Sequence, residues 1–153
     1  MATTTAAVTL TSEDLLTDAL SLSATNTLYK AGTTTGLDQT TGVTKAYLTA
    51  TTSVDIFPTL IEGSIAYKGK SSWVYICNDS EDETEYAIIK VSGNVIGKLY
   101  AGDFMWMPWS MAEDADADNK HADIQLAPSV ATGMWVEYMV IHEGVVLTSS
   151  ADS

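Results

Sequence analysis

Three aspartates, Asp114, Asp116 and Asp118, alternate in the stretch AEDADADNKH, and this spacing comes nearest in the chain to a metal-binding pattern. Carboxylates at positions one, three and five of a calcium loop converge on a hard cation. The pattern then departs, because Asn119 stands at the glycine position and Gln125 at the position of the bidentate glutamate. Two interpretations stay open: a weak set of calcium ligands, or an acidic hairpin loop hydrated by solvent.

Other residue types that could do chemistry do not form a known constellation. His121 and His142 lie on different predicted elements with no Cys or His at ligand spacing, so a zinc site is not predicted. The sequence contains no G-x-S-x-G elbow, H-E-x-x-H pair or glycine-rich phosphate loop. We therefore expect no enzyme and no cofactor. A β-sandwich hydrolase or lyase would need a pocket that joins one of these histidines to acids of perturbed pKa.

The charge balance excludes several classes of partner. The chain carries seven Lys and no Arg against 20 acids, which gives a net charge of -13. Nucleic acids and anionic membranes would repel such a protein, and the bidentate phosphate contacts of Arg are absent. No positively charged leader and no long apolar segment is visible, so we expect a protein that is made in a cytosol and stays soluble.

The composition changes near residue 53 and predicts three regions. Residues 1–53 are rich in Thr and predict an extended arm with short strands, residues 54–148 a β-sandwich domain, and residues 149–153 a tail. Within residues 1–53, Ser12 followed by two acids could cap a short helix through Asp18, or the same stretch could be extended.

Closely spaced strand patterns dominate the second region and define the fold class. SSWVYICN, EYAIIKV, NVIGKLYAG, FMWMPW, ADIQLA and MWVEYMVIHEG follow one another with short polar breaks. This spacing without intervening helices predicts an all-β fold, an antiparallel β-sandwich or a jelly-roll-like barrel. Both faces of WVYICN are apolar, so we expect a central strand covered on both sides, with Cys77 as a small core residue.

The run FMWMPW has large apolar side chains on both strand faces. Phe104, Trp106 and Pro108 share one face, and Met105, Met107 and Trp109 share the other. Either both faces are buried within the domain, or a partner subunit covers one of them. The residues predicted to form a subunit interface are Phe104, Trp106, Met107 and Trp109. A third interpretation is a platform on which Trp106 or Trp109 stacks against sugars.

Residues 54–144 resemble small virion structural proteins of tailed bacteriophages, particularly those of aquatic phages. The resemblance rests on a Y-I-x-N strand at Tyr75–Asn78, an L-x-A-G-[DE]-F-x-x-x-P strand at Leu99–Pro108, and a V-E-Y strand at Val136–Tyr138. These motifs are structural and not catalytic. Residues 1–53 share only their composition with such proteins.

The resemblance implies a decoration (cement) protein on the outer surface of a phage capsid. Its expected partners are the major capsid protein and further copies of itself, as a trimer by resemblance, with no nucleic acid and no membrane. The alternative is a tail, neck or fibre component that binds host glycans. Both alternatives concern assembly. The position of residues 1–53, and whether another chain covers the strand FMWMPW, bear on the choice between them.

Overall fold

The β-strand is the only kind of regular secondary structure among the residues that the structure describes. The computed structural model describes residues 3–15, 17–49, 53–55, 71–91, 93–109, 124–130 and 132–143. The strands are β1 (Thr5–Ser12), β2 (Leu20–Thr27), β3 (Gln39–Thr40), β4 (Thr44–Leu48), β5 (Val54–Asp55), β6 (Ser72–Asn78), β7 (Tyr86–Val91), β8 (Asn94–Tyr100), β9 (Phe104–Pro108), β10 (Ile124–Pro128) and β11 (Met134–His142). These ranges contain no helix that could cross a membrane.

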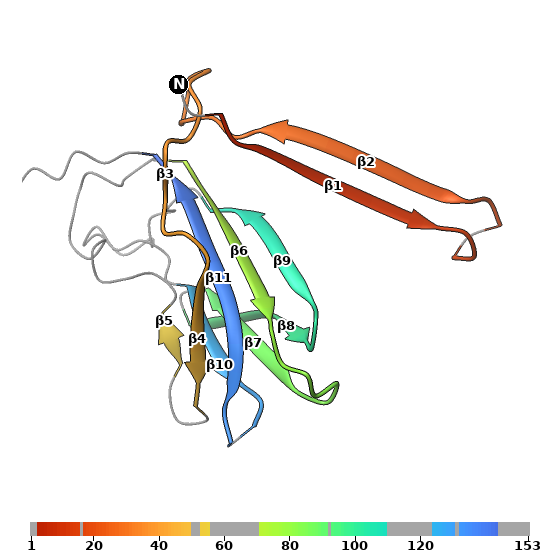
Figure 1. The fold of residues 1–153 in the computed structure, drawn as a ribbon, viewed down its shortest axis with the longest axis vertical. Coiled ribbons are helices and arrows are strands. Elements are labelled where there is room, and N and C mark those ends of the chain that lie inside the picture. Colours follow the sequence, from red (N-terminus) through yellow and green to blue (C-terminus); the bar gives the residue numbers. More distant parts are fainter. Residues whose placement is uncertain are drawn as a thin grey trace, which may run out of the picture.

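Two antiparallel sheets pack face to face as a sandwich (Figure 1). One sheet has the order β3-β11-β6-β9, and β4 also pairs with β11. The other has the order β5-β10-β7-β8, and neither closes into a barrel within the described residues. The prediction of an all-β antiparallel sandwich is confirmed, and the barrel alternative is not what forms.

The core lies between the two sheets and follows from strict alternation along each strand. Val74 and Ile76 of β6 are fully buried, whereas their neighbours on the opposite face are only half-buried. The core residues, all from strands or their ends, are Leu48, Val74, Ile76, Ala87, Ile89, Leu99, Trp109, Ile124, Leu126, Met134, Val136 and Val140. β6 is therefore central as predicted, but its second face is only half-buried in this structure.

The buried side chain of Asn78 joins three segments at the end of β6. Its Nδ2 donates to the carbonyl oxygens of Leu99, at 3.0 Å, and Glu85, at 3.4 Å. Its Oδ1 accepts from the backbone N–H of Ser80 at 3.0 Å. A buried amide is stable only when its donors and acceptors are paired in this way. The Asn of the Y-I-x-N motif thus has a structural role.

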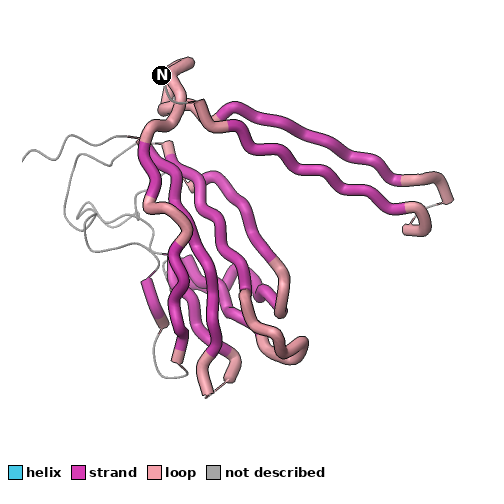
Figure 2. Tube along the Cα trace, viewed as in Figure 1, coloured by secondary structure: helices cyan, strands magenta, loops and turns pink. Residues whose placement is uncertain are grey.

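β1 and β2 form a separate two-stranded hairpin that we call the arm (residues 5–27). All eight residues of β1 pair with β2, from Thr5 with Thr27 to Ser12 with Leu20. Figure 2 shows this hairpin projecting from the sandwich. Ser12 ends β1 and the described residues between the strands form bends, so the predicted helix through Asp18 does not form.

The boundary predicted at residue 53 does not coincide with the observed arrangement. β3 and β4 precede that residue, yet both pair with β11 and belong to the five-stranded sheet. Only the arm stands apart, because pairing with β11 draws the residues after it into the sandwich. The predicted tail, residues 149–153, lies outside the described residues.

We predict that Gly133→Ala destabilises the sandwich more than Gly42→Ala does. Both glycines have positive φ, 88° and 68° respectively. A Cβ at Gly133 would stand 2.6 Å from the Tyr47 ring and 2.7 Å from the Leu48 carbonyl oxygen, whereas one at Gly42 meets nothing within 4 Å. Gly42→Ala should cost about 1–2 kcal/mol of unfolding free energy from backbone strain alone. Urea unfolding measures both, and equal losses would contradict the close packing at Gly133.

Candidate functional site

The two faces of the arm differ sharply in chemistry. The register of β1 and β2 places Ala6, Val8, Leu10, Ser12, Leu20, Leu22, Ala24 and Asn26 on one face, which is apolar except near its two ends. The opposite face carries Thr5, Ala7, Thr9, Thr11, Ser21, Ser23, Thr25 and Thr27. Neither strand contains a charged residue. The arm is therefore an uncharged amphipathic ribbon.

The chain leaves the apolar face of the arm uncovered. Val8 is 43% exposed, and Leu10 and Leu22 are each 52% exposed. An isolated two-stranded hairpin is at best marginally stable in water, and burial of each such side chain contributes about 1.5–3 kcal/mol. The apolar face of the arm is thus suited to contact with another surface.

The base of the arm is closed by backbone hydrogen bonds. Leu28, which follows β2, is 1% exposed, as is Leu37. The Leu28 N–H donates to the Thr4 carbonyl at 2.9 Å, and the Leu37 N–H donates to the Leu28 carbonyl at 3.0 Å. These contacts join the two strands at the base of the arm and tie Leu28 to the loop that follows it.

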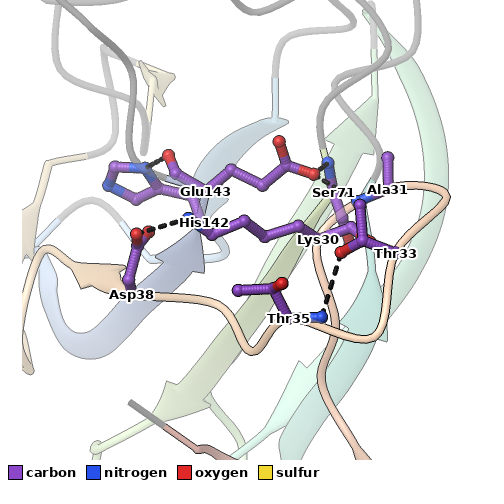
Figure 3. A network of polar contacts seen from close by, with 8 residues as sticks. All are labelled: Lys30, Ala31, Thr33, Thr35, Asp38, Ser71, His142 and Glu143. Carbon is purple, nitrogen blue, oxygen red and sulfur yellow. Dashed lines mark hydrogen bonds and ion pairs between the residues drawn. The ribbon is translucent and has the colours of Figure 1, made fainter. Parts of the chain in front are cut away.

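A polar network fastens the same segment to the end of β11 (Figure 3). The carboxylate of Glu143, which is 4% exposed, accepts hydrogen bonds from the N–H of Ala31 and, at 3.1 Å, from that of Ser71. The Lys30 ammonium and the Asp38 carboxylate form an ion pair at 2.5 Å nearby. The ring Nδ1 of His142 lies 2.8 Å from the Glu143 carbonyl oxygen. Glu143 therefore positions the arm by binding two backbone segments.

A second uncovered surface is the outer face of the five-stranded sheet, which we call the aromatic face. Cross-strand pairing places its members side by side on β9, β6 and β11. They are Trp73, Tyr75, Phe104, Trp106, Met139 and Ile141. The rings of Trp73 and Trp106 stack, with centroids 5.4 Å apart and planes inclined by 23°. Phe104 is 67% exposed.

The four predicted interface residues divide between the two sides of β9. Phe104 and Trp106 lie on the aromatic face, so an interface role stays a prediction for them. Met107 packs against the core, and Trp109 is 4% exposed within it. The strand alternation puts these last two on the inner side, and Trp109 is too deeply buried to stack on a sugar.

Trp106 carries an unpaired donor. Its indole nitrogen is buried and has no hydrogen-bond partner among the described residues. A buried unpaired N–H costs about 1–3 kcal/mol, so this ring is not arranged for the greatest stability of the isolated chain. Conflicts of this kind are typical of surfaces that serve a function.

At the loop end of the sheet, aromatic and charged residues lie together. Tyr47 and Trp135, respectively 46% and 50% exposed, have ring centroids 5.1 Å apart. Lys45 pairs with Asp79 at 2.6 Å and with Glu137 at 3.2 Å. Beside them an open cavity of about 460 Å³ is lined by Asp79, Ser80, Glu81, Asp82, Glu85, Gly133, Met134 and Trp135. It combines one aromatic ring with several carboxylates.

Three side chains have shifted pKa values. Burial, together with the neighbouring Cys77, raises the pKa of the Tyr75 hydroxyl to about 12. Hydrogen bonds to Asp79 and Glu137 raise the pKa of Lys45. Hydrogen bonds from Thr84 lower the pKa of the Asp82 carboxyl. Each shift favours the protonation state that the side chain already has at neutral pH, so none supplies a proton donor or acceptor for catalysis.

The remaining predicted residues have different outcomes. Asp114, Asp116 and Asp118 lie outside the described residues, as does His121, so the calcium interpretation stays a prediction. Among the described residues, no three His, Cys, Asp or Glu side chains converge as metal ligands do. Cys77 was expected in the core, but it is half-buried on the outer side of β6 because odd-numbered residues of this strand point outward.

Sequence reasoning missed Glu143 and Trp135. A glutamate that follows an apolar strand gives no sign that its carboxylate binds backbone N–H groups 72 and 112 residues away. Trp135 alternates with buried Met134 and Val136, so strand periodicity could have placed it outside. Comparisons with protein-family models, curated proteins and solved structures find no match for this chain.

We predict that Glu143→Ala loosens the base of the arm. The N–H groups of Ala31 and Ser71 lose their acceptor, so the unfolding free energy should fall by about 1–3 kcal/mol. Amide exchange at Leu28 and Leu37 should accelerate. Asp38→Asn is the control, because it weakens a partly exposed ion pair with Lys30 worth at most about 1 kcal/mol and leaves the Glu143 carboxylate in place. Unchanged exchange at Leu28 and Leu37 in Glu143→Ala would contradict the anchoring role.

Proposed function

We propose that this chain is a phage virion structural protein, a capsid decoration protein that binds the outside of the mature head as a homo-oligomer. The observation that carries the proposal is the arm, whose two strands carry no charge and whose apolar face the described residues leave exposed. A projecting surface of this kind serves contact with another chain. The phage assignment depends on the sequence resemblance, and the assembly role depends on the geometry.

Two surfaces divide the work in this proposal. The arm joins neighbouring copies, and the aromatic face contacts the major capsid protein. Phe104, Trp106 and Trp73 supply the large aromatic groups that dominate binding energy at protein interfaces. Binding to the assembled shell, and not to free capsid subunits, stabilises the shell by mass action. This mechanism needs no chemistry at any residue.

A tail or fibre component with glycan binding is the second candidate. The open cavity beside Trp135 favours it, because an exposed indole can stack on a sugar ring while carboxylates accept hydrogen bonds from hydroxyl groups. Copy number separates the two roles. A decoration protein is present in hundreds of copies per particle, as capsid lattices require, and a tail component in few.

We predict that the purified chain binds mature heads stripped of their decoration, and that Phe104→Ser weakens this binding about tenfold or more. Phe104 is 67% exposed, so its loss removes apolar contact area without disturbing the core. Val43→Ser is the control, since Val43 is 61% exposed but precedes β4 and is not one of the six residues of the aromatic face. Co-sedimentation with heads measures both.

Binding to tails alone would contradict the head assignment. If Phe104→Ser and Val43→Ser affect head binding equally, the aromatic face does not contact the head. The head assignment itself would still stand.

A further inference from the structure

The arm ends in three acidic residues that have no cationic partner. Glu13, Asp14 and Asp18 lie between β1 and β2 and are exposed. The Ser12 hydroxyl donates to the Asp14 carboxylate at 3.2 Å, and no ion pair among the described residues involves the three acids. An acidic tip would be repelled by an anionic membrane, so the arm is not suited to insertion into one.

The outer face of the four-stranded sheet, which we call the lysine face, carries two lysines without carboxylate partners. Cross-strand pairing sets Lys98 opposite Ile88, two residues from Lys90 on β7. Neither lysine forms an ion pair among the described residues, in contrast to Lys30 and Lys45. Lys98 lies over the Tyr86 ring, 4.2 Å from its centroid. In an acidic protein, this face is a local exception.

The lysine face is also apolar enough to receive the arm. On β8, Val95 is 60%, Ile96 51% and Tyr100 46% exposed. β8 is an edge strand with one side unpaired. Its seven residues span about 24 Å and the eight residues of each arm strand about 27 Å, so the two surfaces match in length.

We propose that the arm of one copy docks along β8 and the lysine face of a second copy, with its acidic tip beside Lys90 and Lys98. The occupant is a second copy because the two surfaces complement each other in charge and apolar character, yet within one chain the arm pairs with no other strand and stays exposed. Each copy both donates an arm and accepts one, so the contact is head-to-tail and closes into a ring when the rotation permits.

This pairing rests on the homo-oligomer of the proposed function and names its surfaces. It uses neither the aromatic face nor the capsid. Two copies of net charge -13 repel each other, and the uncharged strands of the arm add nothing to this repulsion. The acidic tip adds attraction at the lysine face, where the two lysines form no ion pair among the described residues.

Charge reversal on either side of the contact tests the pairing. A tip-reversed chain carries Glu13→Lys, Asp14→Lys and Asp18→Lys, and a face-reversed chain carries Lys90→Glu and Lys98→Glu. All five side chains lie on the surface, so circular dichroism and thermal unfolding should match the wild-type chain. Light scattering after size exclusion should give a mass above the monomer for the wild-type chain. Each reversed chain alone should associate about tenfold more weakly or worse.

An equimolar mixture of the two reversed chains should regain association, because each then meets an opposite charge. A chain with Glu81→Lys and Glu83→Lys alters another exposed acidic loop and changes the net charge by four, against six in the tip-reversed chain, and it should associate as the wild-type chain does. A monomeric wild-type chain at tens of micromolar would overturn the pairing, as would a mixture of folded reversed chains that stays monomeric.

The outcome is separable from that of the head-binding assay. If the charge reversals change association as expected but the protein does not bind heads, the pairing stands and the capsid role is contradicted. Head binding by a chain whose association is indifferent to both reversals keeps the capsid role and removes the pairing.

Discussion

A two-stranded ribbon cannot cover its own apolar face, and this constraint explains which apolar side chains of the chain stay exposed. In the sandwich, the inward side of each strand meets a second sheet, so residues such as Val74 and Ile76 are fully buried. The arm has no second layer, and Leu10 and Leu22 stay half exposed. Its register nevertheless gathers Val8, Leu10 and Leu22 on one face and most of the hydroxyl side chains on the other. Such sorting has a physical purpose only if another surface completes the layer.

The same principle separates the outer faces of the two sheets. The aromatic face gathers Trp73, Trp106 and Phe104, and the Trp106 indole N–H has no hydrogen-bond partner among the described residues. The lysine face carries two lysines that form no ion pair within the described part of the chain. The core fixes the positions of both faces, because the side chains alternate with those that fill it. The sandwich thus positions three exposed surfaces: the arm and two sheet faces.

Strand periodicity accounts for what could be predicted from the sequence. WVYICN and FMWMPW were assigned to strands with the correct alternation, and the all-β class followed from their close spacing. Burial was harder, because an apolar residue on an outward face reads the same as one in a core. Cys77 was therefore placed inside, and Trp109 was grouped with Phe104 in the interface. Long-range pairings left no local trace. β3 and β4 join the sheet only because β11 offers them an edge, and Glu143 binds Ala31 through a contact 112 residues apart in sequence.

Amide hydrogen exchange in β1 and β2, followed as the protein is concentrated from dilute monomer to assembly, tests most directly whether another chain completes the arm. We expect rapid amide exchange at Thr5–Ser12 and Leu20–Thr27 in dilute solution, since a lone hairpin opens readily. Protection of these amides should rise as copies associate. The core strands β6 and β11 should be protected throughout. Exchange in the arm that is independent of concentration, whether fast or slow, would contradict the claim that a second chain covers its apolar face.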